Sequence, residues 1–85
     1  MITVIDVCRS LQIEPTPELT WSAGNIARDR WELATGAPPL KALRPKTYDN
    51  GSHCFAIYPD AFRREIEDII RGLVFERARQ LDLFD

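Results

Sequence analysis

The chain has 85 residues, a net charge of −2, 45% hydrophobic residues and 28% charged residues. A single domain of this length buries roughly 60–65% of the surface of its unfolded chain, which supports one modest core and leaves little room for a deep substrate cleft. The ordinary globular composition argues against disorder throughout, and the small negative charge means that no global basic field draws the chain to nucleic acid.

The start of the chain and its cysteines predict a cytoplasmic protein. The first residues lack the basic region of a signal peptide, Asp6 interrupts their apolar stretch, and no apolar run approaches the ~20 residues of a membrane span. Cys8 and Cys54 are far apart and form no C-x-x-C pair, so we expect reduced, partly buried thiols. No metal, cofactor or membrane is expected as a partner.

The segment from Thr3 to Leu11 is predicted to form a short helix. Thr3 suits the N-cap position, and Asp6 follows three positions later, close to a capping box. Apolar residues recur on one helical face at the spacing i, i+3, i+4, i+7. They are Val4, Val7, Cys8 and Leu11. Pro15 and Pro17 then mark a connector.

A second helix is predicted from Thr16 to Gly36. Thr16 supplies a cap oxygen and Pro17 suits the first helical position, whereas Gly36 followed by two prolines ends the helix. A start one turn later, at Thr20, is the alternative. The apolar stripe comprises Leu19, Ala23, Ile26, Ala27, Trp31 and Ala34. Gly24 costs the helix ~1 kcal/mol relative to Ala, which suggests a close helix contact at this position.

A β-hairpin is predicted from Leu43 to Tyr58. The Asp-Asn-Gly sequence at 49–51 suits the positive φ angles of a tight hairpin turn, and residues 52–58 have a composition typical of a strand. Pro45 limits the first strand to an edge position. A two-stranded ribbon, or a small sheet completed by a short N-terminal strand, satisfies that limit.

The last helix is predicted from Pro59 and Asp60 to about Arg79. Its apolar face comprises Phe62, Ile66, Ile69, Ile70, Leu73, Val74 and Ala78. The predicted order of elements is therefore helix, helix, β-hairpin and long C-terminal helix, and the predicted fold class is α+β.

The middle of the chain, over about 40 residues, resembles the winged-helix domain of regulatory factor X proteins. A long helix containing Trp31 is followed by a hairpin with Gly51 at its turn and with Phe55 and Tyr58 on the return strand. The resemblance implies a small winged-helix-like domain over residues 1–79. A shared topology does not fix function.

The remaining residues, 80–85, read Gln80-Leu81-Asp82-Leu83-Phe84-Asp85. Residues 80–84 resemble the clamp-binding motif of bacterial replication and repair proteins (Gln, Leu, Ser or Asp, Leu, Phe), and every position matches. A match of this length arises by chance roughly once in several thousand chains of this size. The resemblance implies a tail that docks in a hydrophobic pocket on the sliding clamp of the replicative polymerase. The implied contact residues are Gln80, Leu81, Asp82, Leu83 and Phe84.

The chemistry of this tail suits a small docking peptide. Leu83 and Phe84 are adjacent, so a regular helix cannot point both at its own core together with Leu81, whereas an extended or turned peptide can place both in one pocket. The apolar anchors would supply affinity and the Gln80 amide would fix orientation, with a Kd of about 1 µM. The alternative is that the last helix runs on, with Leu81 and Phe84 as its final core contacts.

Basic residues gather in the middle third, because residues 28–59 carry five bases and three acids. The candidate phosphate contacts are Arg28, Arg30, Lys41, Arg44, Lys46 and Tyr48, with the hairpin as a wing. The alternative is an ordinary solvated face, since Asp29, Glu32 and Asp49 lie among these bases. Trp21 lies off the apolar stripe, and its exposure beside Arg28 would favour a protein or nucleic-acid contact.

No catalytic constellation is recognisable in the sequence. His53 is the only histidine, and it neighbours Cys54 on a predicted strand, so the two side chains point to opposite faces. Neither a catalytic triad nor a glycine-rich phosphate loop occurs. We therefore expect a protein that is not an enzyme.

Three functional hypotheses follow. The first is an accessory protein of bacterial or phage DNA replication or repair that docks on the sliding clamp, either to recruit another protein or to block the site. The second is a small winged-helix DNA-binding regulator of phage origin, whose last helix forms a homodimer. The third is an interaction module, which an exposed apolar face at Ile66, Ile69, Ile70 and Leu73 would indicate.

Overall fold

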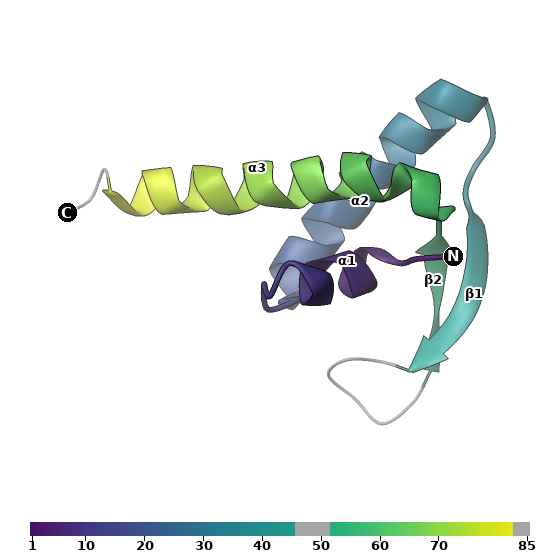
Figure 1. The fold of residues 1–85 in the computed structure, drawn as a ribbon, viewed down its shortest axis with the longest axis horizontal. Helices are drawn as coiled ribbons and strands as arrows, with labels where there is room; N and C mark the ends of the chain where they lie inside the picture. The colour runs from purple at the N-terminus through teal and green to yellow at the C-terminus, as the bar shows by residue number, and fades with distance from the viewer. Residues whose placement is uncertain (46–51, 83–85) are drawn as a thin grey trace.

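The computed structural model describes the backbone of residues 1–45 and 52–82 and the side chains of residues 1–43 and 55–78. Three α-helices and a two-stranded antiparallel sheet make up this part of the chain, which is an α+β fold (Figure 1). The elements in chain order are α1 (Val4–Ser10), α2 (Pro17–Thr35), β1 (Leu40–Pro45), β2 (Ser52–Ile57), the 3-10 turn η1 (Asp60–Phe62) and α3 (Arg63–Asp82).

Helix α1 is short and begins with the predicted capping box. The Asp6 amide donates to the Thr3 hydroxyl at 3.1 Å, and the Thr3 amide donates to the Asp6 carboxylate at 3.0 Å. These two bonds satisfy amides that a helix of seven residues would otherwise leave unpaired. Val7 and Cys8, on the predicted apolar face, are fully buried.

Helix α2 has the predicted start and end. The Leu19 amide donates to the Thr16 hydroxyl at 3.2 Å, and Gly36 adopts the left-handed conformation, with φ 77°, in which its amide reaches the Glu32 carbonyl at 2.7 Å. The alternative start at Thr20 was therefore wrong. The suggestion of a close contact at Gly24 was also wrong, because a Cβ atom placed there would meet no atom within 4 Å.

The sheet begins earlier than predicted, at Leu40 rather than Leu43, because β1 pairs with β2 from Leu40 opposite Ile57 to Pro45 opposite Ser52. The other edge of β2 receives the start of the chain. Ile2 and Tyr58 exchange two backbone hydrogen bonds of 2.8 Å as an isolated antiparallel bridge. Of the two predicted arrangements, the described residues therefore form the two-stranded one, with a single bridge beside it. The predicted turn at 49–51 lies outside the described residues.

The core lies where the three helices and the end of β2 meet. Helix α3 supplies Ile66 and Ile70, which are fully buried, and packs on both α1 and α2. At one end of this core Trp31, Tyr58 and Phe62 form an aromatic cluster with ring centroids 5.1–5.7 Å apart. None of the helices in residues 1–45 and 52–82 is both long and apolar enough to cross a membrane.

Candidate functional site: the free end of α3 and the basic positions

Helix α3 divides into two halves with different surroundings. We call Arg63–Leu73 the packed half, since its apolar residues join the core and its first residue, Arg63, donates to the Ser10 hydroxyl at 3.2 Å. Ile66, Ile69 and Ile70 are buried and Leu73 is partly buried. The apolar face that would have indicated an interaction module is therefore used inside this chain.

The rest of the helix, Val74–Asp82, we call the free half. Figure 1 shows this half extending past α1 and α2, away from the sheet. Phe75 is 68% exposed and Val74 is 38% exposed, and Ala78 is exposed as well. The sequence placed Val74 and Ala78 on the apolar face of the helix, and the structure leaves both exposed, so this part of the face does not join the core.

One ion pair links the free half to the body within the part of the chain that is described. The Arg77 guanidinium lies 3.6 Å from the Glu18 carboxylate in the first turn of α2. Both side chains are largely exposed, so water and salt screen the attraction and the pair contributes about 0–1 kcal/mol. This contact is too weak to fix the end of α3 against the body.

The first three motif-like residues, Gln80–Asp82, form the end of this free half. Helix α3 was expected to end near Arg79, but it continues to Asp82 and includes the backbone of Gln80 and Leu81. Leu83 and Phe84 lie outside the described residues. The backbone of residues 80–82 is thus helical. The predicted docking of Leu83 and Phe84 stays a prediction.

The two basic residues of α2 are each paired with an acid. The Arg30 guanidinium donates to the Glu65 carboxylate on α3 at 3.2 Å, and the Arg28 guanidinium lies 3.8 Å from the Asp29 carboxylate. All four side chains are half exposed or more. Both arginines remain accessible to an anion such as a phosphate, but the carboxylate already paired with each arginine would compete with that anion.

The remaining basic candidates belong to the hairpin. Lys41 is exposed on β1 and pairs in register with Ala56. Arg44 belongs to the described backbone of β1, opposite His53, but its side chain lies outside the described set, as do the side chains of His53 and Cys54. Lys46 and Tyr48 lie wholly outside the described residues. Among the six candidates, the structure describes the side chains of Arg28, Arg30 and Lys41, so a common phosphate-binding surface stays a prediction.

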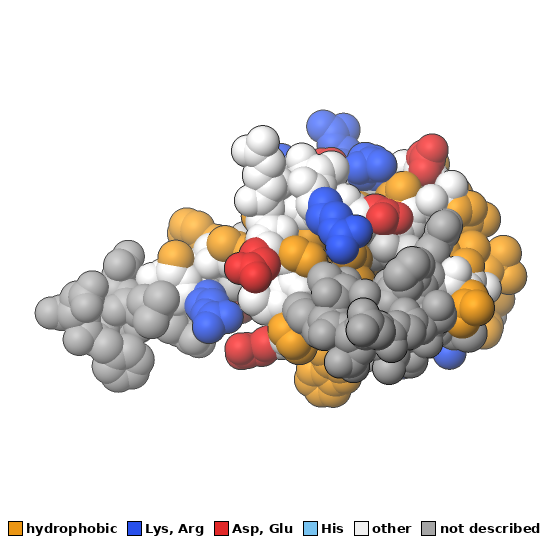
Figure 2. All heavy atoms as spheres, turned by 90° about the horizontal axis from the view of Figure 1, so that it is seen from below, with side chains coloured by type: hydrophobic (Ala, Val, Ile, Leu, Met, Phe, Trp, Pro, Cys, Tyr) orange, Lys and Arg blue, Asp and Glu red, His pale blue; other side chains and the backbone are white. Residues whose placement is uncertain are grey.

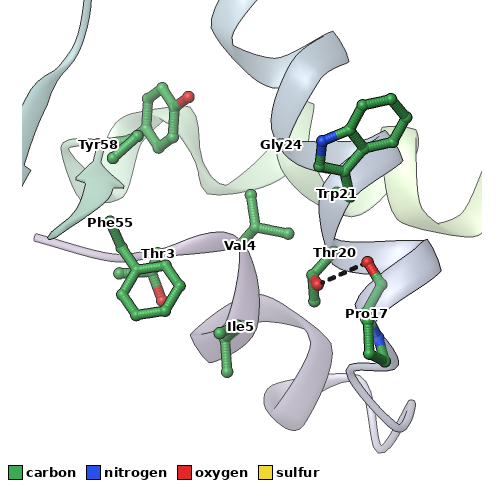
Figure 3. Close-up of a pocket in the computed structure, with 10 residues that line it drawn as sticks. Thr3, Val4, Ile5, Pro17, Thr20, Trp21, Gly24, Phe55 and Tyr58 are labelled. Carbon is green, nitrogen blue, oxygen red and sulfur yellow. Dashed lines mark hydrogen bonds between the residues drawn. The ribbon is translucent and has the colours of Figure 1, made fainter. Parts of the chain in front are cut away.

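The structure contains an apolar cavity that the sequence did not predict. It has a volume of about 310 Å³ and lies between α1, α2 and β2, lined on three sides by Val4, Trp21 and Phe55 (Figure 3). Its lining includes no Asp, Glu, Lys, Arg, His or Cys, and the hydroxyl of Thr20, at its edge, already donates to the Thr16 and Pro17 carbonyls. Such a cavity suits an apolar group.

Trp21 is the one sequence signal that pointed toward this cavity. It was predicted to lie off the apolar stripe of α2 and to be partly exposed, and it is 73% exposed. In Figure 3 its indole projects from α2 at the edge of the cavity. The prediction of exposure is confirmed.

A second apolar groove, of about 460 Å³, lies between the end of α2 and the start of α3. Trp31, Pro59 and Phe62 line its floor, and Leu33, 90% exposed, stands beside it. The charged groups in its lining are Arg30 and Glu65, which pair with each other. Figure 2 shows further hydrophobic side chains on the surface of the molecule.

Two ionisable side chains are buried in the body. Burial raises the pKa of the Cys8 thiol, which disfavours the reactive thiolate at neutral pH. Burial is also the main cause that raises the pKa of the Tyr58 phenol; the Arg28 charge lowers it and the Glu32 charge raises it further. Among the described residues the Tyr58 hydroxyl finds no hydrogen-bond partner, and both side chains are fully buried in the core.

Within residues 1–45 and 52–82, no group of three or more His, Cys, Asp or Glu side chains is placed to hold a metal ion. Comparison of the chain with protein-family models, with curated proteins and with solved structures found no match. The functional argument therefore depends on the residues of this chain alone.

Proposed function

We propose that this chain is a non-enzymatic accessory protein of bacterial or phage DNA replication or repair, which docks on the sliding clamp through Gln80–Phe84. One observation carries the proposal: all of these residues match the clamp-binding pattern at consecutive positions. The proposal places the protein in the bacterial cytoplasm, where the clamp operates.

The surroundings of α3 support this proposal. A peptide that docks in a pocket on another protein must be reachable, and the motif follows a helical segment whose large apolar side chains are already exposed at Phe75. The body keeps its core through Ile66, Ile69 and Ile70, so it does not depend on the motif for its main apolar burial. Docking can therefore occur without unfolding the domain.

The alternative function, a winged-helix DNA-binding regulator, has its own support. The order α1, α2, hairpin, α3, with the Ile2 bridge beside β2, agrees with the winged-helix-like topology that the sequence suggested. Exposed Lys41 on the hairpin and Arg28 on α2 supply positive charge for phosphates. The carboxylates beside the arginines make this the second choice.

The test is calorimetric titration of the full chain with a purified bacterial sliding clamp. We expect a Kd of about 1 µM, lost in the double variant Leu83→Ala with Phe84→Ala, while the thermal stability of that variant stays unchanged. Absence of binding by the parent chain would refute the proposal. A double variant that loses thermal stability would instead identify the segment as the end of the core.

A parallel titration with fluorescent duplex DNA separates the two functions. DNA binding that weakens with salt, and that weakens further in the Lys41→Ala and Arg28→Ala variants, would move the regulator to first place. If the clamp binds, primed DNA synthesis with and without the protein distinguishes recruitment from blocking, since a blocking protein lowers synthesis in proportion to its occupancy of the clamp.

A further inference from the structure

The exposed apolar residues of the free half of α3 form a stripe that leads to the motif. Successive residues of an α-helix are rotated by about 100°, so positions 74, 75, 78 and 81 fall within an arc of about 120°. Val74, Phe75 and Ala78 are exposed, and Leu81 is the next apolar position of this arc along the helical backbone. We call the first three residues the α3 stripe.

The α3 stripe places a large aromatic side chain at the surface close to the motif. Phe75 is 68% exposed and lies on a helix whose neighbouring positions 76 and 77 are charged. Figure 2 shows hydrophobic side chains on this part of α3, next to the grey end of the chain. An exposed phenylalanine beside a recognition motif is costly in water unless a partner covers it.

We propose that the α3 stripe is a second contact surface for the sliding clamp, covering the clamp beside the pocket that receives Gln80–Phe84. This inference rests on the proposed function. Its basis is continuity: the stripe lies on the same helix as the first three residues of the motif, and position 81 falls in the arc of the stripe. A partner that binds the motif would therefore lie close to Val74 and Phe75.

The energetics favour a contact of this kind. A five-residue motif alone buries little surface, and its affinity is correspondingly modest. Once the motif is docked, the stripe meets the clamp intramolecularly, at an effective concentration that can reach the millimolar range. Even a small apolar contact then adds to the affinity, because the entropy of association has already been lost.

A second copy of this chain fits the stripe less well. Helix pairing in a coiled coil requires an apolar repeat sustained over at least three or four heptads, and the free half, from Val74 to Asp82, is little longer than one heptad. Two such segments would bury far less than the ~1,200 Å² of a stable interface. A partner that is already anchored by the motif does not need that area.

The experiment compares full-chain variants in the calorimetric titration with the clamp. Phe75→Ala should weaken binding about fivefold or more, and Phe75→Leu should restore most of the loss because it restores apolar area. Leu33→Ala is the matched control, since Leu33 is also an exposed apolar helical residue, 90% exposed, but lies at the end of α2. The control should bind as the parent does.

The outcomes separate this inference from the proposed function. If the parent chain does not bind the clamp, the proposed function fails and the stripe contact fails with it. If the parent binds, the double variant at 83 and 84 does not, and Phe75→Ala binds as the parent does, only the stripe contact is overturned. Sedimentation equilibrium that shows a dimer lost in Phe75→Ala would likewise overturn it and assign the stripe to a second copy.

Discussion

The packed half and the free half of α3 are continuous in sequence pattern but differ in what covers them. Both carry apolar residues at helical spacing among charged ones. Ile66 and Ile70 are fully buried against α1 and α2, whereas Phe75, little more than one turn beyond Ile70, is 68% exposed. Successive residues of a helix are rotated by about 100°, so Phe75 lies on the side of α3 opposite Ile66 and points away from the core. The comparison teaches that an apolar residue on a helix is buried only where it lies on the side that the neighbouring helices cover.

The largest expected effect tests this comparison directly. Ile70→Ala should reduce the free energy of unfolding by about 2–5 kcal/mol, because it removes buried methyl groups and leaves a cavity. Phe75→Ala, although it deletes a larger side chain, should change it by no more than about 0.5 kcal/mol. Urea denaturation monitored by circular dichroism measures both.

If Ile70→Ala leaves too little folded protein, Ile70→Val serves in its place, with an expected loss of about 0.5–1.5 kcal/mol. A loss in Phe75→Ala as large as that in the Ile70 variant would mean that the free half packs on the body, and the distinction between the halves would be wrong.

The second prediction concerns how the body holds its short N-terminal helix. Thr3→Ala removes the hydroxyl that accepts from the Asp6 amide and should cost about 1 kcal/mol in the free energy of unfolding. Thr35→Ala is the control, because the Thr35 hydroxyl lies exposed at the end of α2, where it donates to nearby carbonyls and accepts from the Ala37 amide at 3.4 Å. Equal effects in thermal unfolding of the two variants would contradict a special role for the capping box.

The third prediction uses the glycine at the boundary between the halves. Gly72 lies within α3, and a Cβ atom added there meets no atom within 4 Å, so Gly72→Ala should stabilise the protein by about 0.5–1 kcal/mol through helix propensity. Gly24→Ala in α2 should do the same, whereas Gly36→Ala should destabilise because Gly36 has a φ of 77°. Destabilisation by Gly72→Ala would reveal a covering contact at the boundary.

The smallest effect at neutral pH is expected for Tyr58→Phe. The phenol has no hydrogen-bond partner, so its removal should change the free energy of unfolding by less than about 1 kcal/mol at pH 7. Burial raises the pKa of Tyr58 in the folded state above that in the unfolded chain. The neutral phenol therefore makes its full contribution to the free energy of unfolding below pH ~10, and this contribution is lost as pH rises through the folded pKa. Parallel stability curves for parent and variant above pH ~10 would contradict this linkage.

Much of the local structure followed from the sequence. The caps at Thr3 and Thr16 and the end of α2 at Gly36 were predicted because each depends on bonds between residues no more than four apart. The α+β class followed in the same way from the order of helical and strand-like segments. The motif at 80–84 was found from residue identity alone, and its docking stays a prediction.

Other features depended on contacts between distant segments. The start of β1 at Leu40 was missed because register with Ile57, seventeen positions away, extends the strand past the local pattern. The Arg30–Glu65 ion pair joins residues 35 positions apart, so no local pattern could indicate that this basic candidate is already partnered. The apolar cavity beside Trp21 likewise forms only where α1, α2 and β2 meet.

The sequence by itself thus determined where α1 and α2 begin and how α2 ends, because these depend on backbone capping. It also showed which residues resemble a recognition motif, because a resemblance depends on side-chain identity alone. Only the tertiary structure decided that Ile66, Ile69 and Ile70 are covered, whereas Val74 and Ala78, on the same predicted apolar face, are exposed. The physical reason is that the covering of an apolar face depends on how the neighbouring helices pack along it, which no periodicity within one helix can specify.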